Sequence, residues 1–429
     1  MHNQIHRQPA SNSATAGALK TLQVPRRFVT NEWGGTETVI LKTSQVMLRA
    51  GHEASIHTSL ALSSQERETL QGVDVQRYDY GYPFWGLAEQ DVRDMDRKGG
   101  NLLSLSLLHG LLREQDVDNL HAHSGKRLGG IVRTAARLRG IPYVVTLHGG
   151  HFDVPTGEME QMLQPIRRTV EWGKPFGALL GSRRVLQDAA AVICVGQNEY
   201  DQARAALPGQ RVELLPNGVD SEFFAHGDGA AFRASHGIPA DRKVILCVSR
   251  IDYQKNQAGL VEAMPEVLTK HPDSHLVLLG PVTVDSYRDR LLKRIRAVGV
   301  GERVTLLPGL PPGDSQLADA YHAADLFCLP SLHEPCGIVV LEAWAAGLPV
   351  VASYVGGIPS FTENGRDVRH VAPAENRSIA AGIIELLDHP EQANRLAGNG
   401  RLKARNEYDW NQVTERLLAI YRDVIGRQS

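Results

Sequence analysis

Residues 325–353 read DLFCLPSLHEPCGIVVLEAWAAGLPVVAS and contain the features of one strand–helix–strand unit. DLFCLP and PVVAS are short apolar runs of the kind that form buried strands. Between them we expect an apolar helix that contains Glu342, preceded by a loop that contains Glu334. Pro335 suits the first turn of that helix. Strand, helix and strand in this order indicate neighbouring parallel strands.

The same alternation extends outward into both halves of the chain. In the second half the apolar runs are KVILCVSR, HLVLLG, RVTLLPG, DLFCLP and PVVAS. In the first half they are RRFVT, NLHAHS, IPYVVTLHGG, AAVICVG and RVELLPNG. Strands that alternate with helices predict an α/β fold, here two doubly wound parallel-sheet domains. Such sheets bind ligands at the carboxyl ends of their strands, so we expect the site in a cleft between the domains.

The chain divides at positions where composition changes. Residues 1–20 are polar and rich in small residues, and we expect a flexible tail there. The first domain would cover 21–216 and the second 217–407, joined within PNGVDSEFFAHGDGA at 216–230. Residues 408–429 show helical spacing of apolar residues, so this last helix must cover a surface.

Bulk composition is that of an ordinary soluble globular protein, with 42% hydrophobic and 22% charged residues. A net charge of −2 argues against a nucleic-acid partner. The four cysteines form no CxxC pair, which favours a reducing compartment, and we expect a cytoplasmic protein. No run of 18 apolar residues or secretory signal is present in this sequence.

Two cations follow the strand in ILCVSRIDYQKN. Arg250 and Lys255 lie in the loop after Ser249, at the predicted carboxyl end of that strand. Such a pair can neutralise a diphosphate and stabilises it most as charge builds up on a leaving group. The alternative is a solvated basic loop without a ligand.

The two acids of the opening stretch suggest a site for hydroxyls. We expect the amides of Cys336, Gly337 and Ile338 to be free at the start of the helix, where they favour an anion. Glu334 is suited to neutral hydroxyls, and Glu342, among apolar neighbours, needs hydrogen-bond donors such as a diol. Alternatively, Glu334 is a capping carboxylate and Glu342 a surface or ion-paired residue.

HEPCGIVVLEAWAAGLPVVAS resembles the Glu-x7-Glu motif of retaining glycosyltransferases of the GT-B fold, family 4. The likeness runs from about Phe28 to Ile425 and includes WGGTET, HAHS, VTLHGG, LPNGVD, VSRIDYQKN and EYDW. It implies two Rossmann-like domains facing across a cleft, with the nucleotide-sugar held mainly by the second. It also implies that the final helix packs back onto the first domain.

The resemblance assigns roles residue by residue. It implies that Glu342 binds ribose hydroxyls and that Glu334 binds hydroxyls of the donor sugar. Arg250 and Lys255 would hold the diphosphate, and with Glu334 they form the expected catalytic charges. The amides of Cys336, Gly337 and Ile338, expected above to be free, complete the donor site.

Three further residues are implied by the first-domain motifs. The glycines Gly34 and Gly35 would let backbone amides approach the phosphates, and His148 would bond the donor sugar near the reacting carbon. Two departures from the family are visible. TLQVPRRFVT is not a clean apolar strand, and position 336 is a cysteine where a bulkier apolar residue is usual, which could alter the fit of the sugar.

The histidines allow a second reading. His121 and His123 form an HxH pair, and His148 and His151 form an HxxH pair, which invites a zinc site. Asp153 is the one carboxylate near ligand spacing, and the resemblance implies a site without metal. We therefore expect no metal ion, and His148 either acts on the sugar or is a structural histidine.

GKRLGGIVRTAARLRG carries Lys126, Arg127, Arg133, Arg137 and Arg139 on a predicted helix. These cations could touch anionic lipid, so peripheral membrane contact is one reading. The simpler reading is an ordinary amphipathic helix with its arginines in water and its apolar residues buried.

The expected activity is retaining transfer of a hexose from a nucleoside diphosphate sugar, UDP- or GDP-linked, to an acceptor hydroxyl. No cofactor is expected, and the acceptor would be a small molecule, a glycan or a lipid-linked sugar. The alternatives are a nucleotide-sugar epimerase and a nucleotide-sugar-binding protein without catalysis. The sequence leaves open the base, the sugar, the acceptor and the oligomeric state.

Overall fold

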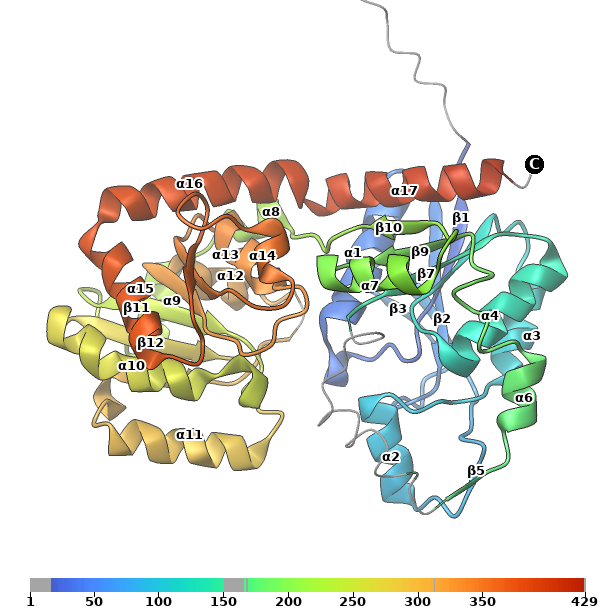
Figure 1. The fold of residues 1–429 in the computed structure, drawn as a ribbon, viewed down its shortest axis with the longest axis horizontal. Coiled ribbons are helices and arrows are strands. Elements are labelled where there is room, and N and C mark those ends of the chain that lie inside the picture. Colours follow the sequence, from blue (N-terminus) through green and yellow to red (C-terminus); the bar gives the residue numbers. More distant parts are fainter. Residues whose placement is uncertain (1–16, 150–165, 167–168, 312, 428–429) are drawn as a thin grey trace, which may run out of the picture.

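The structure is a computed structural model that describes residues 17–149, 166, 169–311 and 313–427. It contains two α/β domains side by side, each built on its own mainly parallel sheet (Figure 1). The predicted fold class is therefore confirmed. The first strand begins at Lys20, paired with Glu53, next to the predicted boundary between tail and first domain. Residues 1–16 lie outside the described part.

The first domain contains one large sheet and a small two-stranded one. The large sheet has β1 (Lys20–Val24), β2 (Glu53–Ser59), β3 (Arg67–Leu70), β4 (Val73–Tyr78), β6 (Asn119–Ala122), β7 (Tyr143–Leu147), β9 (Ala191–Cys194) and β10 (Val212–Leu214). Their order is β10-β9-β7-β6-β1-β2-β4-β3, with β3 antiparallel to β4. Strands β5 (Phe84–Trp85) and β8 (Val170–Glu171) form the small antiparallel sheet.

Helices cover both faces of the large sheet, as its central strands require. β7 is buried at all five positions because parallel strands in such folds have no solvent face. The helices of this domain are α1 (Gly35–Arg49), α2 (Glu89–Lys98), α3 (Leu105–Arg113), α4 (Lys126–Arg139), α6 (Lys174–Leu179) and α7 (Gln197–Ala206). A single-turn 3-10 helix, Thr30–Glu32, precedes α1.

The prediction of a strand at RRFVT was wrong. The strand is β1, KTLQV, and it ends immediately before Pro25. Proline has no N–H to donate, so the ladder stops there. Arg26 and Arg27 consequently belong to the loop at the carboxyl end of β1, where parallel sheets bind ligands.

The second domain is a fully parallel sheet in the order β13-β12-β11-β14-β15-β16. Its strands are β11 (Lys243–Val248), β12 (Ser274–Leu279), β13 (Val304–Leu307), β14 (Leu326–Leu329), β15 (Val350–Ser353) and β16 (Arg369–Val371). Its helices are α8 (Ser221–Phe224), α9 (Gly229–Ser235), α10 (Gln257–Lys270), α11 (Asp285–Ala297), α12 (Ser315–His322), α13 (Ile338–Ala345), α14 (Ile358–Phe361), α15 (Asn376–Asp388) and α16 (Pro390–Glu407). The 3-10 turns are Tyr253–Lys255 and Gly301–Arg303.

The chain passes between the domains twice, and the two passages run together. The Val219 amide donates to the carbonyl of Tyr408 at 2.7 Å, and the Trp410 amide donates back to Val219 at 3.1 Å. After this point α17 (Trp410–Gly426) lies along the first domain, so that α16 and α17 together span both domains (Figure 1). Its apolar face, including Leu418 and Tyr421, packs against the core of the first domain.

Helix α4 matches the amphipathic reading in part: its apolar residues Leu128, Ile131 and Val132 are buried, but two of its arginines are paired inside the domain rather than in water. Arg127 is buried and ion-paired with Glu171, and Arg133 bonds to Asp188, Nε to Oδ2, at 2.7 Å. Leu138, another apolar residue of this helix, is 68% exposed, contrary to the expectation that its apolar residues are buried. The helix therefore presents no row of free arginines. Within the described residues, no helix is long and apolar enough to cross a membrane.

Candidate functional site

A cavity of about 320 Å³ lies between the domains, where the strands of the second sheet end; we call it the interdomain cavity. First-domain residues supply one wall, and loops after β11, β12 and β13 with the start of α13 supply the other. Its lining includes Trp33, Thr38, Leu41, Lys42, Ser249, Arg250, Gly280, Pro281, Gly309, Leu310, Ile338, Val339 and Glu342. This is the edge at which parallel sheets hold ligands.

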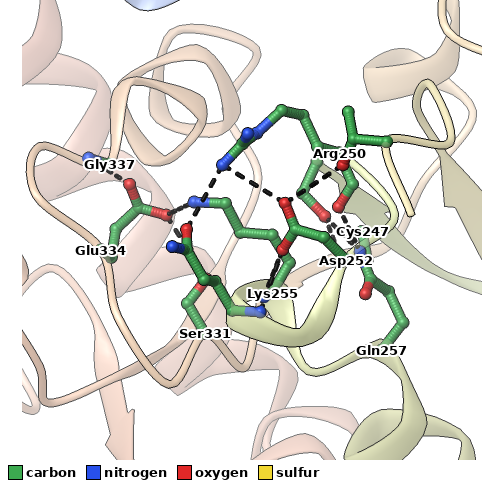
Figure 2. Close-up of polar contacts among 11 residues, drawn as sticks. Cys247, Arg250, Asp252, Lys255, Gln257, Ser331, Glu334 and Gly337 are labelled. Carbon is green, nitrogen blue, oxygen red and sulfur yellow. Dashed lines mark hydrogen bonds and ion pairs between the residues drawn. The ribbon is translucent and has the colours of Figure 1, made fainter. Parts of the chain in front are cut away.

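Arg250 follows β11 and lines the interdomain cavity, with its guanidinium turned toward Asp252 (Figure 2). Its side chain is 52% exposed, with Nη2 3.3 Å from Asp252 Oδ2 and 3.3 Å from Gln254 Oε1. Gln257 fixes the loop, because its Nε2 donates to Ser249 Oγ at 2.8 Å and to the carbonyl of Arg250 at 2.7 Å. The guanidinium thus keeps donors available for an anion while its backbone is held.

Lys255 and Glu334 form a buried ion pair beside Arg250 (Figure 2). Lys255 Nζ is 2.7 Å from Glu334 Oε2, and both side chains are about nine-tenths buried. Glu334 also accepts from the Gly337 amide at 3.1 Å and from Ser331 Oγ at 3.3 Å. The prediction that the Gly337 amide is free was therefore wrong. Glu334 bonds the amide of the N-cap residue, Gly337, and α13 has no side-chain cap of its own, so the alternative capping role is present only in part. Glu334 is also the counter-charge of Lys255.

Gly337 is required by the geometry of this loop. It has φ +68°, and a Cβ built there would lie 2.3 Å from Ile358 Cδ1. A side chain would thus clash and strain the backbone at once. The helix begins at the next residue, Ile338, so Pro335 lies outside it rather than in its first turn. Cys336 is a neutral thiol, because burial raises its pKa to about 12.

Glu342 lies one turn into α13 and lines the interdomain cavity. Tyr321 Oη donates to Glu342 Oε2 at 2.7 Å, and among the described residues Glu342 has no cationic partner. Burial raises its pKa to about 7, although the Tyr321 hydrogen bond lowers it. The alternative of a surface or ion-paired residue was wrong. A carboxylate held this way accepts further donors, as a ligand diol would provide.

The glycine loop of the first domain faces this helix. Gly34 is the N-cap of α1 and Gly35 its first residue. A Cβ on Gly35 would lie 3.5 Å from Ile338 Cδ1, so the start of α1 and the start of α13 are near contact across the cleft. Two helix N-termini that face each other favour an anion between them.

His148 lines a different cavity of about 330 Å³, which we call the first-domain cavity. Its lining includes Pro25, Arg26, Arg27, Thr36, Glu37, Asn101, His123, Lys126, Thr146, His148 and Gly149. This cavity adjoins the Glu334 loop at Gly149, because a Cβ on Gly149 would lie 2.9 Å from Pro335, the residue after Glu334. The structure therefore brings Arg250 and Glu342 to one cavity, Lys255 and Glu334 beside it, and His148 to the neighbouring cavity.

The histidines bond to each other. His148 Nε2 is 2.8 Å from His123 Nδ1, and His123 Nε2 is 2.7 Å from Gln23 Oε1. Burial lowers the pKa of His148 to about 4, so it is neutral near pH 7. The HxH pair thus takes part in a hydrogen-bonded chain. His151 and Asp153, the other members of the zinc reading, lie outside the described residues.

Three cations of the first-domain cavity were not singled out together from the sequence. Arg26 and Arg27 follow β1, and Lys126 is the first residue of α4. Glu37 is the carboxylate that shares this lining, 3.9 Å from the Arg27 guanidinium. Burial and then the neighbouring Arg26 lower the pKa of Lys126. The sequence did contain a signal for Arg26 and Arg27: Pro25 directly follows an apolar run, so it ends β1 and places both arginines at the ligand-binding edge of the sheet.

Two family models match this chain and together cover most of both domains. Residues 34–218 match the model described as Glycosyl transferase 4-like domain, and residues 228–403 match Glycosyl transferases group 1. Over 419 residues the chain is 32% identical to the D-inositol 3-phosphate glycosyltransferase of Actinosynnema mirum, an alignment that covers 93% of this chain and 95% of that protein.

Solved structures with the same architecture have lower sequence identity. Sucrose-phosphate synthase from Thermosynechococcus elongatus superposes with a TM-score of 0.71 at 21% identity, over 95% of this chain and 100% of that one. HepE of Anabaena, in complex with UDP, gives a TM-score of 0.70 at 18% identity, over 94% and 100%. These likenesses confirm the two-domain GT-B fold.

Proposed function

Because this chain belongs to the group 1 glycosyltransferases, we propose that it transfers a hexose from a nucleoside diphosphate sugar to an acceptor hydroxyl, with retention and without a metal ion. One observation carries the proposal. A strongly basic side chain, Arg250, and a partly buried acid that needs donors, Glu342, line one cavity at the carboxyl ends of the second sheet. A diphosphate and a ribose diol are the groups that match them.

The donor would occupy the interdomain cavity with its ribose at Glu342 and its diphosphate at Arg250 and Lys255. Lys255 can keep its bond to Glu334, because an ammonium has three N–H groups and Glu334 needs one. The base would rest on the backbone near Pro281 and Leu310, which line the same cavity. UDP or GDP sugars are the expected donors, and the UDP complex of HepE supports the first.

In the proposed reaction the bond between the anomeric carbon and the diphosphate oxygen breaks, and the acceptor oxygen bonds to that carbon on the same face. The acceptor proton passes to the leaving diphosphate. Arg250 and Lys255 stabilise the negative charge that develops there, which is the role that a metal ion would otherwise take. Neutral His148 would hydrogen-bond the sugar near the reacting carbon.

The acceptor would enter through the first-domain cavity, which begins at His148. Its lining carries Arg26, Arg27 and Lys126 against the carboxylate of Glu37, so an acceptor with an anionic group fits best. Among the described residues, Lys126 has no hydrogen-bonding or ion-pairing partner. The name of the relative from Actinosynnema mirum contains a phosphorylated compound, D-inositol 3-phosphate, and this supports an anionic acceptor.

A screen of UDP-, GDP- and ADP-sugars for thermal stabilisation, followed by turnover with and without acceptor, tests the proposal. We expect one nucleotide class to stabilise the protein, and turnover in chelator-treated enzyme to need an acceptor and to retain the anomeric configuration. An isomerised sugar nucleotide formed without acceptor would favour an epimerase. Binding without any turnover would favour a silent binding protein, and a requirement for added metal would contradict the metal-free mechanism.

A further inference from the structure

Behind His148 lies a continuous chain of side-chain hydrogen bonds that crosses the first domain and ends on the last helix. We call it the histidine chain, and its members are Gln23, His121, His123, Thr146, His148 and Tyr421. Gln23 Nε2 lies 3.4 Å from Tyr421 Oη, Tyr421 Oη lies 2.6 Å from His121 Nδ1, and His121 Nε2 lies 2.6 Å from Thr146 Oγ1. The His148–His123–Gln23 bonds described above complete it.

The Gln23 amide sets the direction of the protons. Its oxygen can only accept, so His123 Nε2 must carry a proton and donate to it. A neutral imidazole has one proton, so His123 Nδ1 is bare and accepts from His148 Nε2–H. His148 therefore has a bare Nδ1, and no described residue bonds to that atom. On the other side, Gln23 Nε2 donates to Tyr421, which leaves the tyrosine hydroxyl proton for His121.

Burial keeps the whole chain neutral. It lowers the pKa of His121 to about 3 and that of His123 well below its usual range, with the neighbouring histidines adding to the effect. Other charged groups near His148 are Arg26, Arg27, Lys126 and Glu37 in the first-domain cavity. Glu199 of α7 accepts from the Gly149 amide at 3.0 Å. With neutral rings, the neighbouring hydrogen bonds alone decide which nitrogen of His148 is protonated.

We propose that Gln23 and Tyr421 are positioning residues that hold His148 in its Nε2–H form, so that bare Nδ1 accepts a hydroxyl of the reacting sugar. This rests on the proposed function. Tyr421 belongs to α17, so the segment that follows the second domain helps to set the proton state in the first. An inverted Gln23 amide would reverse every proton in the chain and give His148 the opposite tautomer.

Removal of the Gln23 amide tests the positioning role. Gln23→Met keeps the volume but removes donor and acceptor, and Tyr421→Phe removes the partner that orients the amide. We expect kcat to fall roughly tenfold to a hundredfold in both, by analogy with the groups that orient metal-binding histidines through their other nitrogen. The KM for the donor should stay unchanged. Tyr143→Phe is the control, because Tyr143 is also buried and lies on β7 of the sheet that contains Gln23, but its Oη donates to the carbonyl of Val185 at 2.7 Å, outside the histidine chain.

Gln23→Glu distinguishes the two tautomers. A carboxylate at this position accepts from His123 Nε2–H, as the amide oxygen does. Tyr421 can then donate its hydroxyl proton to the other carboxylate oxygen, and His121 can move its own proton from Nε2 to Nδ1 to donate to Tyr421. We expect kcat near pH 7 to be kept and the acid limb of the rate–pH profile to move to higher pH, because a nearby carboxylate stabilises the imidazolium. Loss of kcat in folded Gln23→Glu to the level of Gln23→Met would overturn the assigned tautomer.

A spectroscopic readout separates this proposal from the proposed function. ¹⁵N chemical shifts of the His148 ring, identified by comparison with His148→Asn, report directly whether Nδ1 is bare. We expect a bare Nδ1 in the wild type and in Gln23→Glu, and a mixture of tautomers in Gln23→Met. A protonated Nδ1 in the wild type would refute the inference even if the protein proves to be an active transferase. A bare Nδ1 without transferase activity would remove the proposed function and leave the histidine chain intact.

Discussion

The cluster around Arg250 and the histidine chain both hold polar side chains in fixed positions inside the protein, but they do so in opposite ways. Around Arg250, charged groups neutralise one another, and the Lys255–Glu334 pair is buried with every charge partnered. Around His148, burial removes the charge, and hydrogen bonds between neutral groups hold the rings. A charged cluster is suited to a diphosphate, whose own charge changes during reaction. A neutral chain is suited to hydroxyls, which it orients without attracting ions.

The difference also predicts how much activity is lost when a group of each region is removed. A charged group that meets a leaving group contributes directly to transition-state stability, so its loss costs most. A group that orients another acts through one intermediate residue, so its loss costs less. The variants below test this order, beginning with the largest expected effect.

Removal of either cation at the donor site should have the largest effect. In Arg250→Ala and Lys255→Ala we expect turnover to fall about 10²–10³-fold, equivalent to about 2–4 kcal/mol of transition-state stabilisation. Lys255→Ala should also lower stability, because it leaves the buried carboxylate of Glu334 unpaired. Steady-state kinetics and thermal melts measure the two effects. Arg366→Ala is the control, since Arg366 is 70% exposed and its ion pair with Glu363 lies at the surface. Near-normal turnover in both donor-site variants would contradict the mechanism.

Glu342 should make stability depend on pH. Its pKa rises from an ordinary 4.5 to about 7 on folding, because burial disfavours the charged form. Its contribution to stability is therefore fully present below about pH 4.5 and is lost as pH rises through about 7. Between pH 5 and about pH 8 the unfolding free energy should therefore fall by roughly 2 kcal/mol in the wild type, and this fall should disappear in Glu342→Gln. Denaturant titrations from pH 5 to about pH 8 measure it, and an unchanged slope would show that another group titrates.

The first-domain cavity should discriminate acceptors by charge. In Lys126→Gln we expect the KM for a phosphorylated acceptor, tested as D-inositol 3-phosphate, to rise about tenfold, the loss of one partly exposed ionic contact. The donor KM should not change. Lys174→Gln replaces an exposed lysine at the start of α6 and serves as the control. An equal rise for unphosphorylated inositol would show that Lys126 does not read the anion.

Gly35 should give the smallest effect of the series. A Cβ there would make an ordinary contact with Ile338, at 3.5 Å, so Gly35→Ala should change unfolding free energy by less than about 1 kcal/mol. If the donor phosphates approach this backbone, the same methyl should raise the donor KM. Comparison of the donor KM with the melting temperature separates the two. A donor KM equal to wild type would remove Gly35 from the donor site.

The sequence predicted what local patterns encode. Apolar runs predicted the two parallel sheets, and the acids at 334 and 342 were found because they lie eight positions apart beside one helix. It did not predict that Lys255 would pair with Glu334, which is 79 positions away, because no local pattern records which loop ends meet. For the same reason it assigned the Gly337 amide to a ligand rather than to Glu334.

The histidine chain was beyond such reasoning. Gln23 and Tyr421 lie 398 positions apart, and an amide or a phenol within an apolar segment gives no signal of its partner. One signal was available, since His121 and His123 alternate on one strand and so share a face of the sheet. That pattern was read as a possible metal pair, whereas the rings bond to Tyr421, Thr146, Gln23 and His148.

The central claim is that donor and acceptor meet between two adjacent cavities, with the donor held by charge in the second domain. A crystal structure with the sugar nucleotide that stabilises the protein most tests this directly. We predict a diphosphate within hydrogen-bond distance of Arg250 and Lys255, a ribose on Glu342 and the sugar directed toward His148. A nucleotide bound anywhere outside the interdomain cavity, with these side chains unengaged, would contradict the account.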